Sequence, residues 1–93
     1  MTGKVTEKKW YLYILECKDS SLYTGITDDL DRRLAAHGSG RGAKYTRGRG
    51  PLILRYVQEC LSHSDALKEE LKVKRLPRSQ KIELCRSFGA CDI

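Results

Sequence analysis

Arg33 and His37 stand four positions apart in the segment TDDLDRRLAAH and would share one face of a helix. A guanidinium donates several hydrogen bonds to anionic oxygens and keeps its charge, so Arg33 is either a phosphate ligand or a solvated helix arginine like its neighbour Arg32. His37 could transfer a proton or position a water molecule, although a histidine near a helix end is also a common capping charge. The pair indicates acid–base chemistry on an anionic substrate.

Glu70 interrupts an apolar surface of a second expected helix. The segment SHSDALKEELKVKRL predicts a helix that begins at Ser62, with an apolar arc formed by Ala66, Leu67, Leu71, Val73 and Leu76. A carboxylate in the middle of that arc is costly unless a cation or hydrogen bonds compensate it. Glu70 therefore forms a salt bridge to Arg33 or a neighbouring lysine, or it binds Mg²⁺, which commonly takes one or two carboxylates together with water and phosphate oxygens.

A glycine-rich basic segment, residues 38–51 (GSGRGAKYTRGRGP), lies between these two expected helices. It holds five of the eight glycines and four cations, at Arg41, Lys44, Arg47 and Arg49. Such a segment can approach an anion through its backbone and its side chains. The net charge of +6 and a pI near 9.3 favour a polyanion or an anionic membrane surface as partner, although many small basic domains bind nothing charged.

The four cysteines do not indicate a metal site. Cys17, Cys60, Cys85 and Cys91 contain no Cys-x-x-Cys pair, and the two histidines are too few to complete a zinc site. We expect four reduced thiols in a cytoplasmic protein. The polar N-terminus has no signal-peptide pattern and no apolar run reaches the roughly 20 residues of a membrane span, so we expect no membrane partner.

Strands must position these side chains. Residues 10–16 (WYLYILE) and 22–27 (LYTGIT) predict a hairpin, and residues 52–58 (LILRYVQ) a third strand. In the first strand the more apolar even-numbered face, which includes Leu12 and Ile14, is expected to face the core, unless helices cover both sides of the sheet. A last helix, RSQKIELCRSF, would turn Ile82, Cys85 and Phe88 inward.

The order of these elements predicts a small α/β or α+β fold with a sheet of three strands. We expect one domain over residues 10–88, a disordered or extended tail over 1–9 and a C-terminal tail over 89–93. Ninety-three residues leave little room for a deep cavity, so a substrate would lie on the surface.

Two tripeptides, Tyr11-Leu12-Tyr13 and, ten residues later, Tyr23-Thr24-Gly25, resemble the signatures of the GIY-YIG nuclease family, most closely its small stand-alone YhbQ-like branch. The segments TGITDDLDRRLAAH, SGRGAKYTRGRGPL and ALKEELKVKRL look like the continuation of that branch, so the resemblance covers residues 10–84. Each tripeptide alone is a weak signal, but the combination in this order is specific. Both tripeptides depart from the eponymous letters while keeping the tyrosines and the second glycine.

The resemblance implies a three-stranded antiparallel sheet flanked by helices, with the catalytic residues on one concave face. Carried over by position, the catalytic residues would be Tyr13, Tyr23, Arg33, His37 and Glu70, and Glu70 would bind one Mg²⁺ or Mn²⁺. Tyr13 would accept a proton from the attacking water or orient it. The DNA-binding residues would be Arg41, Lys44, Tyr45, Arg47 and Arg49 of the basic segment.

The expected function is metal-dependent hydrolysis of DNA phosphodiester bonds in repair or recombination. Nothing in the sequence resembles a base-reading helix, so branched or nicked DNA is a more plausible substrate than a fixed sequence. Two alternatives stay open at this point: a non-catalytic nucleic-acid-binding module and a protein-interaction domain on the same scaffold. A protein partner could add specificity, and the sequence does not identify one.

Overall fold

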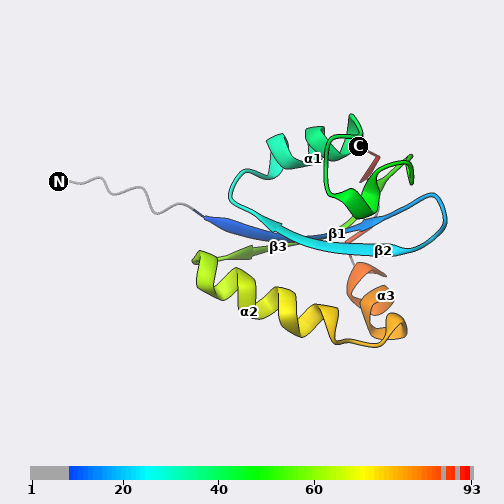
Figure 1. Cartoon of the computed structure of the whole chain (residues 1–93). Helices are drawn as coiled ribbons and strands as arrows, with labels where there is room; N and C mark the ends of the chain where they lie inside the picture. Colours follow the sequence, from blue (N-terminus) through cyan, green and yellow to red (C-terminus); the bar gives the residue numbers. More distant parts are fainter. Residues whose placement is uncertain (1–8, 87, 90, 93) are drawn as a thin grey trace.

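The computed structural model describes residues 9–86, 88, 89, 91 and 92. Most of the predicted N-terminal tail, residues 1–8, lies outside the described residues, as do residues 90 and 93 of the predicted C-terminal tail. The elements follow one another in the order β1 Trp10–Glu16, β2 Leu22–Thr27, α1 Leu30–Gly38, the 3₁₀ turn η1 Lys44–Thr46, β3 Ile53–Cys60, α2 His63–Lys74, α3 Arg78–Arg86 and β4 Cys91–Asp92 (Figure 1).

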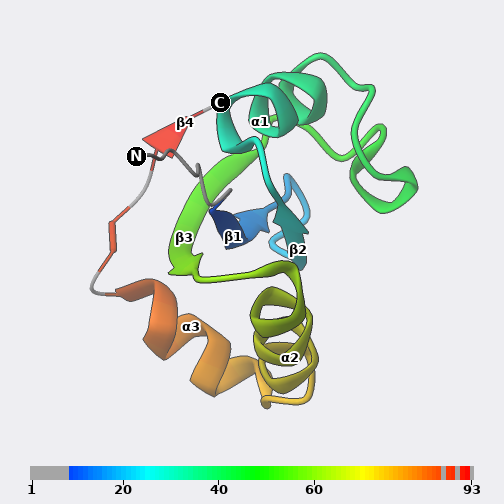
Figure 2. The same ribbon diagram turned by 90° about the vertical axis from the view of Figure 1, so that its left-hand side faces the viewer.

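The sheet is antiparallel with the order β2-β1-β3-β4, so that β1 lies in the middle and β2 forms one edge. The register places Tyr13 opposite Gly25 and Leu15 opposite Tyr23. The predicted α+β fold with three antiparallel strands is confirmed. A fourth strand of two residues, β4, adds to the outer side of β3 opposite Ile53 and Leu54 (Figure 2).

Helices cover both faces of the sheet. In Figure 1, α1 and η1 lie above the strands, and α2 and α3 lie below them. Both sets of β1 side chains are therefore buried: Leu12 and Ile14 on the α2 face, Tyr13 and Leu15 on the α1 face. The expectation of an inward even-numbered face is right for Leu12 and Ile14, and the odd-numbered face is buried as well because α1 covers it.

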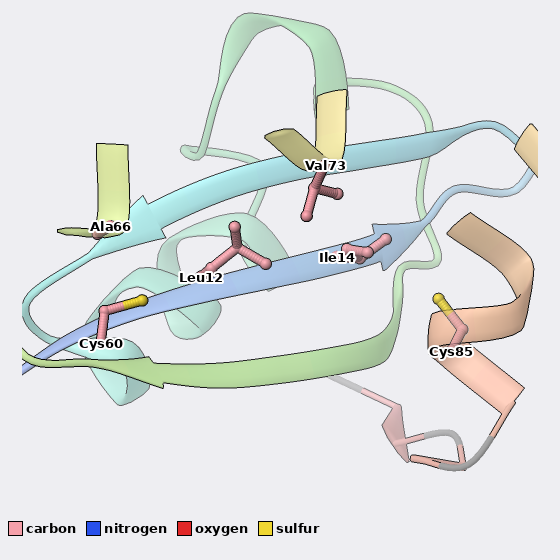
Figure 3. Close-up of a cluster of buried hydrophobic side chains, with 6 residues drawn as sticks. All are labelled: Leu12, Ile14, Cys60, Ala66, Val73 and Cys85. Atoms are coloured by element: carbon pink, nitrogen blue, oxygen red, sulfur yellow. The ribbon is translucent and has the colours of Figure 1, made fainter. Parts of the chain in front are cut away.

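The core on the α2 face consists of small and branched side chains, namely Leu12, Ile14, Cys60, Ala66, Val73 and Cys85 (Figure 3). The predicted apolar arc of α2 is wrong for Leu67 and Leu71, which are 46% and 52% exposed. Ala66 and Val73, two turns apart, form the contact with the sheet instead, so the two leucines fall on the flank of the helix. On α3 only Cys85 of the predicted inward residues is buried, whereas Ile82 and Phe88 are 40% exposed.

Three of the four cysteines have described side chains. Cys17, Cys60 and Cys85 are free and buried, and burial raises the pKa of the Cys60 and Cys85 thiols. The side chain of Cys91 lies outside the described part of the chain. Among the described residues, no helix is both long and apolar enough to cross a membrane.

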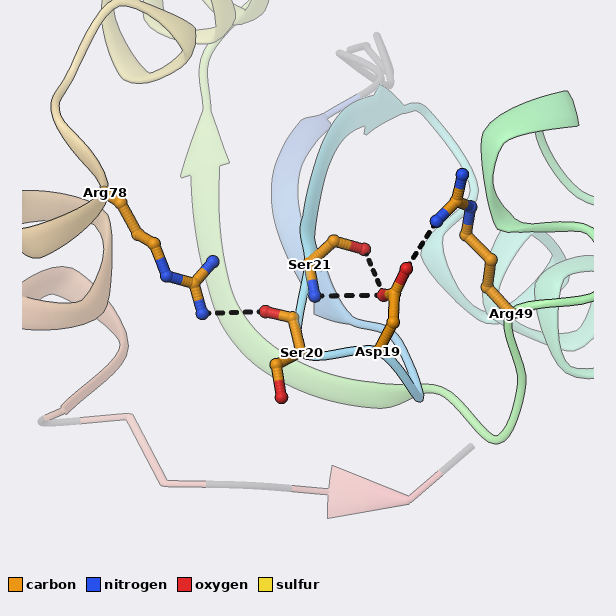
Figure 4. Close-up of polar contacts among 5 residues, drawn as sticks. All are labelled: Asp19, Ser20, Ser21, Arg49 and Arg78. Atoms are coloured by element: carbon orange, nitrogen blue, oxygen red, sulfur yellow. Dashed lines mark hydrogen bonds and ion pairs between the residues drawn. The ribbon is translucent and has the colours of Figure 1, made fainter.

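Two arginines fix the turn between β1 and β2 from opposite sides. Asp19 accepts hydrogen bonds from the backbone N–H and hydroxyl of Ser21 and an ion pair from Arg49, while Arg78 of α3 donates to the carbonyl oxygen of Ser20 (Figure 4). Ser20 itself adopts a left-handed conformation, with φ of 69°. The turn thus connects the basic loop above the sheet with α3 below it.

Candidate active site

A chain of three hydrogen-bonded side chains lies on the α1 face of the sheet. The phenolic oxygen of Tyr13 on β1 lies 2.9 Å from Nε2 of His37 on α1. Nδ1 of the same imidazole lies 3.0 Å from Oγ1 of Thr46 in η1. Tyr13, His37 and Thr46 are 0%, 2% and 4% exposed, so a strand, a helix and the basic loop meet in one polar cluster closed to water.

The hydrogen bonds determine which nitrogen of His37 carries the proton. The Thr46 hydroxyl donates to the carbonyl oxygen of Ala43 at 2.9 Å, so it must accept from Nδ1 of His37. Nε2 is then unprotonated and accepts from the phenolic O–H of Tyr13. Burial, with the nearby Arg33 charge as a second cause, lowers the pKa of His37 to about 4, which keeps the imidazole neutral at physiological pH.

Two glycines allow this cluster to close. A Cβ at Gly42 would lie 2.1 Å from Nδ1 of His37, and a Cβ at Gly25 would lie 2.6 Å from the phenolic oxygen of Tyr13. Neither atom could give way without moving a buried ring. The sequence predicted that the glycines of residues 38–51 let the backbone approach an anion. In the structure, Gly42 instead packs against the imidazole of His37.

Arg33 connects the two signature tyrosines. Hydrogen bonding with the phenols of Tyr13 and Tyr23 raises the pKa of its guanidinium, the Tyr13 contribution being the larger. Burial raises the pKa of Tyr13, and the hydrogen bond from Arg33 opposes that shift, so the phenol is protonated in the free protein. Tyr13 is completely buried, while Tyr23 and Arg33 are half-buried and lie nearer the surface.

Glu70 lies on α2, on the other side of the β2 edge. Its side chain is 20% exposed, and its Oε2 lies 3.2 Å from Nζ of Lys74, one helical turn later. A salt bridge to a neighbouring lysine was one of the pairings that the sequence left open. Burial is the main cause of the raised pKa of Tyr13, and the charge of Glu70 is a minor contribution to it. Its neighbour Glu69 instead bonds Gln58 of β3 and Lys72.

A single carboxylate offers a limited metal site. Within residues 9–86, 88, 89, 91 and 92, no three His, Cys, Asp or Glu side chains are grouped so that they could hold an ion by themselves. Mg²⁺ or Mn²⁺ suits such a site when water and phosphate oxygens supply the other ligands. Glu70 therefore fits a divalent ion that binds together with a nucleic acid, and does not fit a closed protein cage.

Two hollows lie along the edge strand β2. One of about 260 Å³ is lined at the C-terminal end of β2 and the start of α1 by Thr27, Asp28, Asp29, Arg32, Arg33 and Ala36. The other, of about 290 Å³, is lined by Leu22, Tyr23, Thr24, Tyr45, Lys74 and Lys81. Arg33 and Tyr23 each line one of them, so an extended substrate along β2 could contact both residues.

The predicted DNA-binding residues lie on the loop around η1. Arg41, Lys44, Tyr45 and Arg47 are exposed and Arg49 is half-buried. Tyr45 stacks on Tyr23 with ring centroids 6.0 Å apart, and the guanidinium of Arg49 lies 4.4 Å from the centre of the Tyr45 ring. Because Asp19 also pairs with Arg49, that arginine has less charge available for a phosphate than the other basic residues of the loop.

The structure brings Tyr13, Tyr23, Arg33 and His37 together and places Glu70 within electrostatic range of them. Sequence reasoning missed Thr46 and Gly42, which hold the imidazole of His37, although both lie in the segment quoted for the resemblance. It also assigned no role to Lys74 or Lys81. No periodicity marks these four positions: Gly42 and Thr46 reach His37 through the irregular loop that follows α1, and Lys81 approaches β2 only through the packing of α3.

Comparisons with known proteins agree with this architecture. Residues 9–83 match the model of the GIY-YIG catalytic domain. The chain is 50% identical over 78 residues to "UPF0213 protein OB0043" of Oceanobacillus iheyensis, covering 84% of this chain and 91% of that protein. It is 54% identical over 79 residues to "UPF0213 protein BH0048" of Halalkalibacterium halodurans, covering 85% of this chain and 84% of the relative.

Two solution NMR structures are similar to this fold. The structure of the UPF0213 protein BH0048 from Bacillus halodurans has a TM-score of 0.54 at 53% identity, covering 82% of this chain and 81% of that one. The protein EF2693 from E. faecalis has a TM-score of 0.60 at 41% identity, covering 87% and 86%. The names of these proteins state no substrate.

Proposed function

Because the chain belongs to the GIY-YIG family, whose members are nucleases, we propose that it is a divalent-metal-dependent endonuclease that hydrolyses DNA phosphodiester bonds. Tyr13, Tyr23, Arg33, His37 and Glu70 form its active site in this proposal. The observation that carries it is the Tyr13–His37–Thr46 chain, a buried and oriented polar cluster next to Arg33. Burying polar side chains costs free energy that an apolar core would not, so a cluster of this kind indicates a function beyond stabilising the fold.

Arg33 holds the scissile phosphate in this mechanism. Its guanidinium stays charged at every physiological pH, and hydrogen bonding with the two phenols, that of Tyr13 first, raises its pKa further. A phosphate bound there also offsets the Arg33 charge, which is one of the two causes of the low His37 pKa. Substrate binding therefore makes His37 a better proton acceptor than it is in the free protein.

The two tyrosines have different tasks. Tyr23 is the partly exposed phenol, so it orients the attacking water beside Arg33. Tyr13 was expected to contact this water itself, but its complete burial leads us to place it behind Arg33, where its O–H donates to Nε2 of His37. In this position Tyr13 is a positioning residue that holds the imidazole of His37 in one orientation.

Glu70 would hold one Mg²⁺ or Mn²⁺ together with phosphate oxygens of the DNA. Nucleases of this family depend in general on a divalent metal. The ion, when bound, supplies positive charge that stabilises the developing negative charge on the phosphate and the leaving oxygen. Glu70 must then exchange its ion pair with Lys74 for the ion.

The basic loop binds the DNA backbone through Arg41, Lys44, Arg47 and Arg49. Phosphate contacts position a duplex without reading its sequence, so we propose branched, nicked or flapped DNA in repair or recombination as the substrate. Affinity should fall steeply as salt concentration rises.

The test is cleavage of labelled branched and linear DNA by the purified protein with and without Mg²⁺. Glu70→Gln should abolish cleavage, whereas Glu69→Gln, which makes the same change on the β3 side of α2, should leave most of it. An absence of cleavage by the wild-type protein, or equal cleavage by Glu70→Gln, would contradict the proposal.

The Glu70–Lys74 ion pair supports one alternative, a nucleic-acid-binding module that has lost turnover. In that case Lys74 is the permanent partner of Glu70. Salt-sensitive DNA binding that Glu70→Gln leaves unchanged, without cleavage on any DNA, would select this alternative.

A further inference from the structure

The hollow at the N-terminal end of β2 combines aromatic and cationic walls. Tyr23 of β2 and Tyr45 of η1 come from the α1 side of the sheet, and Lys74 of α2 and Lys81 of α3 come from the opposite side. They meet around the edge of β2, where an edge strand leaves backbone N–H and C=O groups without strand partners. The hollow therefore presents rings, two ammonium groups and backbone hydrogen-bonding groups to the same volume.

We propose that this hollow binds one unpaired nucleotide of the DNA strand, with its base against Tyr23 and Tyr45 and its phosphate on Lys74 and Lys81. The inference rests on the proposed function, which it deepens by naming the feature of the substrate that is recognised. A base inside a duplex enters a protein hollow only at an unpairing and unstacking cost of a few kcal/mol, whereas an unpaired nucleotide at a flap or branch can enter at little cost.

The dimensions agree with a single nucleotide. About 290 Å³ lies just below the roughly 300–1,000 Å³ of typical ligand pockets, which suits a ligand no larger than one nucleotide. Aromatic side chains beside basic groups are the usual means of binding single-stranded nucleic acid without reading its sequence. Tyr45 is 42% exposed, and its ring is oriented by Tyr23, on which it stacks, and by Arg49, whose guanidinium lies 4.4 Å from the ring centre. A base that stacks on the outer face of Tyr45 takes the place of this guanidinium.

The hollow also adjoins the proposed chemistry. The Tyr23 ring lies beside His37, with ring centroids 5.5 Å apart, and Lys74 is paired with Glu70, so both walls adjoin residues of the proposed active site. Lys81 forms no ion pair with any other described residue, which leaves its ammonium available for a phosphate. An unpaired nucleotide held here would lie next to the scissile phosphate and determine where the strand is cut.

The experiment measures binding without metal, so that no DNA is cleaved. A duplex with a 5′ flap carrying one 2-aminopurine is compared with the same duplex fully paired, by anisotropy for affinity and by quenching of the fluorescent base for stacking. The double variant Lys74→Ala/Lys81→Ala should bind the flap about tenfold more weakly. The matched control Lys68→Ala/Arg86→Ala removes the same charge from the same two helices outside the hollow.

Tyr45 provides a second, independent readout. Tyr45→Ala should weaken flap binding by roughly tenfold and restore the fluorescence of the unpaired base, while Tyr45→Phe should retain the quenching. Lys81→Ala alone repeats the affinity measurement without disturbing Glu70. Thermal unfolding of each variant confirms that it is folded.

The inference is overturned if Lys74→Ala/Lys81→Ala weakens binding of the flap no more than its control does, or weakens binding of the flap and of the paired duplex equally. It is also overturned if the wild-type protein does not quench the fluorescence of the unpaired base. These outcomes separate it from the proposed function. Cleavage with no flap preference removes the nucleotide site alone, and flap preference without cleavage by the wild-type protein removes the nuclease proposal alone.

Discussion

Adjacent residues of β1 are buried in different ways on the two faces of the sheet. Leu12 and Ile14 face small and branched side chains of α2 and α3 and make no directional contact (Figure 3). Tyr13, between them on the other face, is just as buried but is held by the His37 hydrogen bond and by Gly25, which leaves no room for a methyl group. The α2 face stabilises the fold by burying apolar area, whereas the α1 face buries polar side chains whose hydrogen bonds fix their orientation at a cost in stability.

The largest effect on stability is expected on the apolar face. Leu12→Ala should lower the free energy of unfolding by about 2–5 kcal/mol, because it removes a fully buried side chain and leaves a cavity. Urea unfolding measures this loss. Cleavage by the folded fraction should stay near the wild-type rate.

Tyr13→Phe is the matched change on the opposite face. It should cost only about 1–2 kcal/mol, from the lost hydrogen bond, yet reduce cleavage by at least tenfold. If Leu12→Ala impaired folded-state cleavage as much as Tyr13→Phe, the two faces would not differ in function.

Acid should destabilise the polar face through His37. The pKa of His37 is about 4 in the folded protein and near 6.5 when unfolded, so the unfolded chain binds more protons as pH falls between these values. The stabilisation is complete above about pH 6.5 and is lost toward pH 4, by up to about 3 kcal/mol. Denaturation at several pH values measures it. His37→Gln should flatten this dependence, and the same exchange at the exposed His63 should not.

Gly42→Ala tests how closely the loop must approach His37. The new Cβ would overlap Nδ1 of the imidazole, so the loop or ring must shift at a cost of about 1–3 kcal/mol. We expect the Tyr13–His37 hydrogen bond to break and cleavage to fall. Gly50→Ala, where a Cβ meets open space, is the control, and equal effects of the two substitutions would refute the packing argument.

Thr46→Val should have the smallest effect on stability, about 1 kcal/mol, but a specific spectroscopic effect. Without the hydroxyl, Nδ1 of His37 loses its acceptor and the tautomer is no longer fixed. Nitrogen-15 chemical shifts of the imidazole should change from one tautomer to a mixture, and cleavage should fall. Thr46→Ser keeps the hydroxyl and should restore both; an unchanged tautomer in Thr46→Val would contradict the assignment.

Local signals in the sequence predicted the elements well. Alternation in residues 10–16, the Ser62 cap and the four-residue spacing of Arg33 and His37 each report on contacts between near neighbours, and the hairpin, α2 and the shared face of α1 agree with them. Chain-local reasoning failed for the exposed Leu71, because the orientation of a helix on a sheet is decided by the whole interface.

The site was harder to predict than the fold. Glu70 stood out because it breaks an apolar pattern, whereas Thr46 and Lys81 break none. Their positions depend on which loop lies against His37 and on how α3 returns to the β2 edge, and both depend on long-range packing. The burial of Tyr13 was equally invisible, since a strand with both faces covered has no sequence mark that distinguishes its two sides.

The central claim is that the polar face of the sheet cleaves DNA, and the most direct test compares two adjacent arginines of α1. Arg33 is half-buried and its pKa is raised by hydrogen bonding with the phenols of Tyr13 and Tyr23, while Arg32 is exposed. In single-turnover cleavage of branched DNA with Mg²⁺, Arg33→Ala should lose at least about a hundredfold in rate, and Arg32→Ala should stay within about threefold of wild type. Equal losses for the two variants, or a wild-type rate for Arg33→Ala, would contradict the account.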